Sequence, residues 1–168
     1  KAVEWFQQAA AVGNSQAECC LGDCYFGGTG VKEDERAAVE WFRKSAEQGD
    51  PDGQRNLAQC LQSATGVEQD NREAVEWFRK AAEQDDAEAC LDLAQCYATG
   101  NGVQRGTATA REWAQKSTDN GNEYASEWLE NYERFALLTT AIEELVTREA
   151  IIAIIIQGVF GTAIANIL

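Results

Sequence analysis

The sequence predicts an all-α protein: an α-solenoid of 36-residue helix-turn-helix repeats, followed by a divergent C-terminal helical tail. The first observation is a phrase that recurs every 36 residues, with its tryptophan at Trp5, Trp41, Trp77 and, in a weaker copy, Trp113. The second is another phrase with the same step, which begins at Leu21, Leu57 and Leu93. Because the two phrases share one period, each repeat is expected to be a helix pair that buries its apolar side against the next pair.

The first helix of each repeat is expected to carry one apolar stripe. In the first complete copy, helical spacing aligns Ala17, Leu21, Cys24 and Tyr25. Gly22 lies at the edge of this stripe, and the later copies have Ala58 and Ala94 there. A small residue at this position predicts that a neighbouring helix comes close.

The turn and the second helix are also repeated. Each turn holds an aligned glycine, which predicts a positive φ, and then a valine that is expected to fill the space between the two helices. These residues are Gly30, Gly66 and Gly102, followed by Val31, Val67 and Val103. The second helix then presents apolar residues on one side, and its charged side reads as a solvated surface.

The elements combine into a lone second helix over residues 1–12, three complete repeats, and one further first helix near residues 122–133. We therefore assign residues 1–133 to the solenoid and residues 134–168 to the tail. Lys1 falls inside a repeat, so we expect the chain to be a fragment or a processed form of a longer protein.

The composition restricts the function. A net charge of −14 disfavours nucleic acid as a ligand and leaves protein or peptide partners. The chain has no histidine, the usual general base and zinc ligand. The acidic pairs Glu33–Asp34 and Asp85–Asp86 fall in turns or at helix starts, where capping explains them better than catalysis. We expect no enzyme activity, no metal and no cofactor.

The six cysteines are expected to be free thiols. Cys24, Cys60 and Cys96 share one register, so they lie about 8–10 Å apart in stacked repeats, beyond the reach of a disulfide. We interpret them as small apolar core residues. Cys19, Cys20 and Cys90 have no counterparts, and the absence of a CxxC pair argues against a thiolate metal site. Free thiols favour a reducing, cytoplasmic location, with membrane association left open.

The pattern from Ala17 to Val31, A-x-x-x-L-G-x-x-Y-x-x-G-x-G-V, and the following A-x-x-W-F-x-K-x-A resemble the Sel-one-like repeat, a relative of the tetratricopeptide repeat. The resemblance covers residues 1 to about 133. It implies an adaptor that holds other proteins. One cysteine-rich branch of the family binds penicillins and pairs cysteines across the junction between repeats. The matching pairs here are Ala10–Glu18, Ala46–Gln54 and Ala82–Cys90; none is complete, so penicillin binding is not carried over.

The binding face is expected on the first helices, which line the concave groove in the related tetratricopeptide arrays. Two neighbouring polar registers follow this face, and their carboxylates and amides suit an extended peptide or basic side chains. Trp128 stands out, because a tryptophan at an otherwise polar position is either a binding anchor or is covered locally. The candidate partner-binding residues are Asp23, Asn56, Gln59, Asp92, Gln95, Trp128 and Asn131.

The tail allows three interpretations. Phe135, Leu138, Ile142, Leu145 and Val146 predict an amphipathic helix, and residues 150–168 carry no charge. The tail could cap the solenoid or lie in its groove, join two copies of the chain, or anchor it in a membrane. The leading hypothesis is a non-catalytic scaffold for a protein partner. The alternative is a membrane-anchored adaptor or a small subunit of a membrane complex.

Overall fold

The computed structural model describes the backbone of residues 1–165 and the side chains of residues 1–149. This part of the chain forms eight α-helices and no strand, which confirms the all-α prediction. The helices are α1 (Ala2–Ala11), α2 (Ser15–Phe26), α3 (Glu35–Glu47), α4 (Pro51–Ser63), α5 (Asn71–Glu83), α6 (Ala87–Thr99), α7 (Thr107–Asp119) and α8 (Glu123–Ala165).

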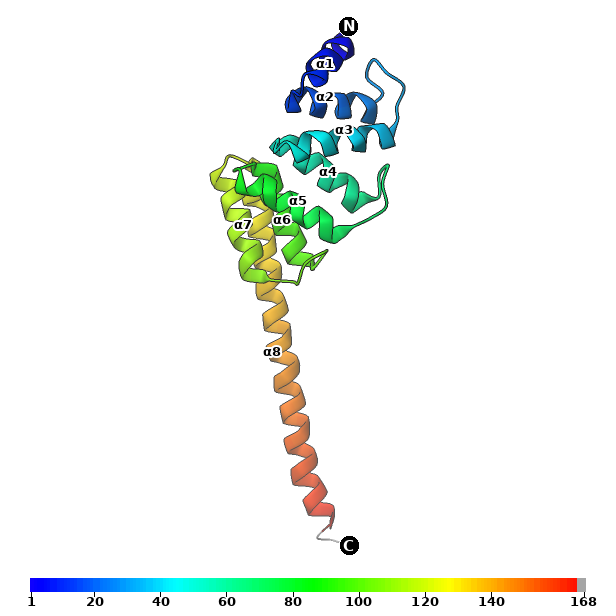
Figure 1. Cartoon of the computed structure of the whole chain (residues 1–168). Helices are drawn as coiled ribbons and strands as arrows, with labels where there is room; N and C mark the ends of the chain where they lie inside the picture. The colour runs from blue at the N-terminus through cyan, green and yellow to red at the C-terminus, as the bar shows by residue number, and fades with distance from the viewer. Residues whose placement is uncertain (166–168) are drawn as a thin grey trace. The chain divides into compact units, whose positions relative to one another are not determined.

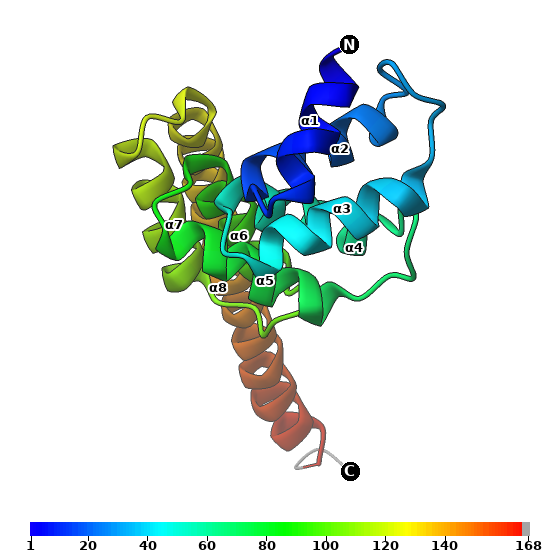
Figure 2. The same ribbon diagram turned by 45° about the horizontal axis from the view of Figure 1, so that its top comes forward.

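The chain divides into two compact units, Lys1–Glu127 and Trp128–Leu168. In the first unit the helices pack in chain order, each on the one before it and the one after it (Figures 1 and 2). The first helices of the repeats are α2, α4 and α6, and the second helices are α1, α3, α5 and α7. In addition, α2 and α4 contact each other directly. These two first helices therefore approach each other along one side of the array.

Short polar residues set the helix starts. Asp34 and Asp86 precede α3 and α6, and their carboxylates accept hydrogen bonds from the amides of Ala37 and Ala89, at 3.0 and 2.7 Å. Pro51 occupies the first turn of α4, where its missing N–H costs nothing. The capping role predicted for the two acidic pairs is therefore confirmed for Asp34 and Asp86.

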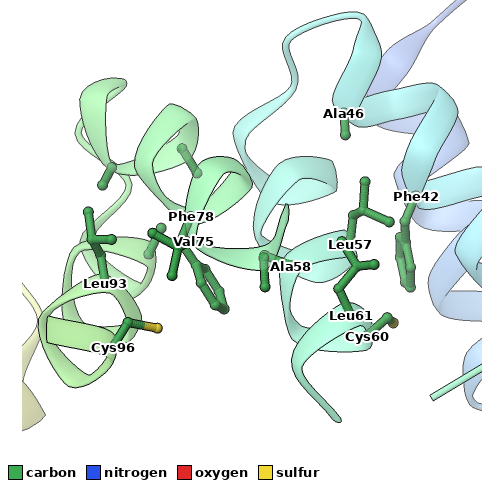
Figure 3. Packing of buried hydrophobic residues seen from close by; sticks show 14 of the residues in the cluster. Phe42, Ala46, Leu57, Ala58, Cys60, Leu61, Val75, Phe78, Leu93 and Cys96 are labelled. Atoms are coloured by element: carbon green, nitrogen blue, oxygen red, sulfur yellow. The ribbon is translucent and has the colours of Figure 1, made fainter. Parts of the chain in front are cut away.

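The hydrophobic core has the same period as the sequence. Leu57 and Leu61 of α4 lie beside Phe42 of α3, and Phe78 of α5 and Leu93 of α6 belong to the same buried cluster (Figure 3). All of these side chains are buried, and burial of each contributes about 1.5–3 kcal/mol. A Cβ added to Gly22 would overlap the Phe42 ring, which confirms the predicted close approach.

The turn glycines hold the repeats in register. Gly30, Gly66 and Gly102 have φ values of 77°, 67° and 72°, as the sequence predicts. At the last two positions an added Cβ would also overlap the backbone carbonyl of the preceding repeat's second helix, at Glu35 and Asn71. The valines that follow pack on the core between the helices, as expected: Val31, Val67 and Val103.

The cysteines are free thiols. Cys24, Cys60 and Cys96 are buried, in agreement with the core role predicted for them. Burial raises the pKa of Cys19 to about 12 and that of both Cys60 and Cys96 to about 11. These three thiols stay protonated at neutral pH and act as apolar side chains.

The repeat junctions use hydrogen bonds at the positions where the cysteine-rich branch pairs its cysteines. Gln54 donates its side-chain amide to the carbonyl of Ala46, 3.3 Å away. One repeat later, the Cys90 thiol lies 3.7 Å from the carbonyl of Ala82. A polar contact between the second helix and the next first helix therefore recurs at each of these two junctions.

The second unit consists of the greater part of α8. The rings of Trp128 and Tyr132 stack in parallel, with centroids 4.9 Å apart. Several large apolar side chains further along α8 are exposed. Within the described residues, no helix combines the length and the apolar character needed to cross a membrane. The side chains of residues 150–168, which carry the membrane-anchor prediction, lie outside the described part.

Candidate partner-binding face

Side chains of adjacent first helices form hydrogen-bonded pairs across the repeats. Asn56 of α4 donates its amide to the Asp23 carboxylate of α2, 3.3 Å away, and Gln59 of α4 donates to the Asp92 carboxylate of α6, 3.0 Å away. All four residues belong to the predicted binding registers. The structure therefore joins them in two pairs on one face, which we call the inner face: the side of α2, α4 and α6 that carries these pairs.

Three adjoining hollows follow the inner face. The first, of about 300 Å³, lies between α2 and α4 and shares Asp23 and Asn56 with the second, of about 130 Å³. The second shares Gln59 with the third, of about 280 Å³, which lies between α4, α6 and the start of α8 at Tyr124. Because neighbouring hollows share lining residues, we treat them together as one groove across the repeats, in which carboxylates and amides lie beside apolar side chains such as Phe26 and Leu91.

Among the described residues that line these hollows, Arg55 is the only basic one, and its charge is already neutralised. Its guanidinium nitrogens lie 3.1 Å from the Asp52 carboxylate, 3.5 Å from Asp86 and 2.6 Å from Glu88. The Arg55 side chain is largely buried, and it links α4 to the start of α6. These three carboxylates outnumber the one guanidinium, so the groove keeps a negative charge.

Asp23 and Asp92 have no ion-pair partner within 4 Å among the described residues. Burial raises the pKa of Asp23, and the nearby Asp52 carboxylate adds to the effect. Burial also raises the pKa of Asp92, although the hydrogen bond from Gln59 opposes the shift. A raised pKa means that the ionised carboxylate is poorly compensated, so a cation placed in the groove would stabilise both groups.

The other predicted residues are placed differently. Gln95 is exposed on α6, one turn after Asp92. Trp128 and Asn131 belong to the second unit, so the groove of the first unit is described without them. Arg55 was not among the predicted binding residues; it occupies the register of Cys19 and Leu91 in the flanking repeats. A charge at an otherwise apolar position was the available signal.

A further hollow, of about 720 Å³, lies elsewhere, between the turns after α2 and α4. Its lining includes Glu33, Asp34, Glu35 and Glu68, of which Asp34 serves as a helix cap. No other feature of these turns indicates a ligand. In the described part of the chain, no three acidic, cysteine or histidine side chains are grouped closely enough to bind a metal ion.

The second helices present a repeated pair of a lysine above a tryptophan ring. The ammonium lies 4.0 Å from the ring centroid for Lys44 over Trp41 and 3.5 Å for Lys80 over Trp77. Such cation–π contacts contribute about 0.5–1 kcal/mol each at exposed sites. They explain the recurring tryptophan by stability, without a ligand.

A stack of helix pairs with an extended surface along its first helices is the architecture of helical-repeat proteins. The Sel1 repeat family matches residues 1–14, 15–50, 51–86 and 87–122, and the chain belongs to this family. This result confirms the resemblance seen in the sequence. Sel1 repeat proteins generally mediate protein–protein interactions and are typically non-catalytic.

Solved structures show the same fold. The structure of c5321, a protective antigen of uropathogenic Escherichia coli strains with an SLR fold, is 38% identical over 80% of this chain, with a TM-score of 0.75. A Sel1 repeat protein from Oxalobacter formigenes is 34% identical over 76% of the chain, with a TM-score of 0.72. The chain spans only 29% and 52% of those two proteins.

Cysteine rich protein B of Helicobacter pylori shares the fold at a TM-score of 0.61 and 22% identity, over 77% of this chain and 98% of that one. At this level of identity the similarity concerns the fold alone. The comparison with curated proteins gives no match.

Proposed function

We propose that this chain is a non-catalytic scaffold that binds an extended, basic segment of a partner protein along the inner face. The main support for this proposal is the groove formed by the three hollows. Its lining includes four of the seven residues expected to contact a partner: Asp23, Asn56, Gln59 and Asp92. The general role of Sel1 repeat proteins in protein–protein interaction supports the proposal.

The charges of the groove favour a basic segment. Arg55 is held by three carboxylates, whereas Asp23 and Asp92 are left with amide partners. A lysine or arginine of the partner would provide each with an opposite charge and offset the cost of its burial. The side-chain carbonyl oxygens of Asn56 and Gln59 can also accept hydrogen bonds from a peptide backbone.

The spacing of the repeats suggests the spacing of the basic residues. Asp23 and Asp92 lie two repeats apart, and packed helices are separated by about 8–10 Å. An extended peptide rises about 3.3 Å per residue. Two basic side chains about six residues apart would therefore meet the two carboxylates. Gln95, Trp128 and Asn131 stay predictions and are not needed for this contact.

Fluorescence anisotropy of the 1–168 chain with labelled peptides tests the proposal. The probe peptide has two lysines six positions apart in a polar spacer, and the comparison peptide has glutamates at those positions. We expect binding of the lysine peptide only, weakened about tenfold by the double substitution D23N/D92N. The control E40Q/E76Q removes the same charge from exposed positions of α3 and α5. Equal loss in both variants, or no loss in D23N/D92N, would reject the inner face.

A further inference from the structure

A row of large apolar side chains lies exposed along α8 in the second unit. Phe135, Leu138, Ile142 and Leu145 are 62%, 61%, 59% and 59% exposed, and no described residue covers them. An exposed apolar surface of this kind marks an association site.

The spacing of this row is that of a coiled coil. Alternating steps of three and four residues connect its members, which are Trp128, Asn131, Phe135, Leu138, Ile142, Leu145 and Glu149. This heptad pattern covers three heptads in the described residues, and the sequence continues it with Ile152, Ile156 and Val159. We call the row from Trp128 to Glu149 the seam. A seam with a period of 3.5 residues fits another helix of the same period.

We propose that the seam pairs with the seam of a second copy of this chain to form an antiparallel two-stranded coiled coil. The two polar members of the seam favour this direction. In a parallel pair each seam residue faces its own counterpart, so two Glu149 carboxylates would meet in the apolar interface. An antiparallel pair that places Leu138 against Ile142 of the second copy avoids this contact.

That register matches the layers between Asn131 and Glu149 by polarity. Phe135 faces Leu145 of the second copy, and Asn131 faces Glu149 of the second copy, so an amide donor meets a carboxylate acceptor. Ala141 lies beside the two-fold axis, where its small side chain allows the helices to approach. In this dimer, Trp128 and Asn131 face the second helix rather than a peptide.

The charges around the seam favour a second copy over a lipid surface. From residue 134 onward α8 carries Arg134 and Arg148 and the acidic residues Glu143, Glu144 and Glu149. Helices that lie on membranes are rich in basic residues on the polar face instead. On the flank of the antiparallel register, Arg134 faces Arg148 of the second copy. Because these two arginines repel each other, we expect Arg148→Glu to lower the dissociation constant of the dimer.

Sedimentation equilibrium of the full 1–168 chain tests the proposal. We expect a dimer at micromolar concentration, and a dissociation constant at least about 100-fold weaker for Ile142→Asp, which buries a charge in the interface. The control is Leu137→Asp, because Leu137 is 72% exposed but lies off the seam. The proposal would be overturned if the wild-type chain were monomeric, or if Leu137→Asp weakened the dimer as much as Ile142→Asp does. Assemblies larger than a dimer that persist in Ile142→Asp would also overturn it.

Cross-linking tests the direction. Oxidation of Ala141→Cys should give a covalent dimer, because position 141 meets itself only in the antiparallel register, and Thr140→Cys on the outer side should not. Equal cross-linking of both variants would overturn the antiparallel dimer. Pelleting of the wild-type chain with phosphatidylcholine vesicles, abolished by Ile142→Asp, would also overturn it by assigning the seam to a membrane.

Discussion

Asn56 donates its side-chain amide to the carboxylate of Asp23 in the preceding repeat, across 3.3 Å. One turn further along α4, Gln59 donates in the opposite direction, to Asp92 of the following repeat. The central repeat therefore supplies amides to carboxylates on both sides. This arrangement leaves an acidic group on each of the two outer first helices, α2 and α6, and the neutralised Arg55 lies on α4.

Asp92 is expected to cost stability at neutral pH. Burial raises its pKa in the folded state above the ordinary value, near 3.9. The folded state thus binds the proton more tightly, so this contribution to stability is present below the ordinary pKa and is lost as the pH rises through the folded-state value. We expect Asp92→Asn to raise the melting temperature at pH 7 and to have little effect below pH about 3.5.

Thermal unfolding of both proteins across this pH range checks the prediction. Glu76→Gln on the exposed side of α5 serves as the control, since removal of any carboxylate from a chain with a net charge of −14 relieves some repulsion. An increase no larger than that of the control would show that Asp92 is not strained by burial. The same Asp92→Asn variant should lose affinity for a basic peptide, so stability and binding move in opposite directions.

Arg55 is expected to join the second and third repeats. Replacement by alanine leaves the carboxylates of Asp52, Asp86 and Glu88 close together without their cation, and we expect a loss of about 1–2 kcal/mol in the free energy of unfolding. Urea unfolding measures the loss, and high salt should reduce it. Lys32→Ala removes an exposed positive charge from a turn and should change little. If both variants unfold alike, Arg55 contributes only its net charge.

The turn glycines are expected to differ in importance although they share a positive φ. Alanine at any of them strains the backbone by about 1–2 kcal/mol. At Gly66 and Gly102 the new Cβ would also overlap a backbone carbonyl of the preceding repeat, which adds about 1–3 kcal/mol. Gly121 has a φ of 92° and open space around it. We expect Gly102→Ala to destabilise far more than Gly121→Ala in urea unfolding, and equal losses would mean that the repeats do not need this contact.

The junction between α5 and α6 is expected to accept a disulfide. The Cys90 thiol already lies 3.7 Å from the carbonyl of Ala82, at the position of a cysteine pair in the cysteine-rich branch. Ala82→Cys should therefore form a bridge on oxidation and raise stability by about 2–3 kcal/mol, a value typical of a short loop. Mass spectrometry and melting curves, with and without reductant, measure both effects. Ala46→Cys is the matched control, because the residue opposite it is Gln54 and not a cysteine. A disulfide in that variant would show that the new cysteine pairs with a cysteine outside its own junction.

The fold was largely predictable from the sequence, because each repeat has the same types of residue at the same core and turn positions. Gly66 and Val67 mark the turn, and Cys60 fills the same core position as Cys24 and Cys96. A period of 36 residues made these positions comparable without an alignment of relatives. The registers also placed Asn56 and Asp23 on one face, but they did not predict the hydrogen bond that joins the two residues.

The features that were not predicted depend on contacts between residues of different registers. Arg55 reaches Asp86 and Glu88 through a long side chain, and the repeat pattern does not give the conformation of that side chain. The three hollows likewise arise from the shape of neighbouring side chains, such as Phe26 beside Phe42, rather than from any one register. A residue that differs in type from its counterparts in the other repeats, as Arg55 does, is the sequence signal that indicates such contacts.

The most direct test of the central proposal is a ¹⁵N–¹H spectrum of the side-chain amides during titration with the two-lysine peptide. The inner-face account predicts that the resonances of Asn56 and Gln59 shift together and saturate at the concentration that saturates anisotropy. Gln48 and Gln84, which lie at the ends of the second helices α3 and α5, should stay unchanged. Shifts confined to Gln48 and Gln84, with Asn56 and Gln59 unaffected, would contradict the account.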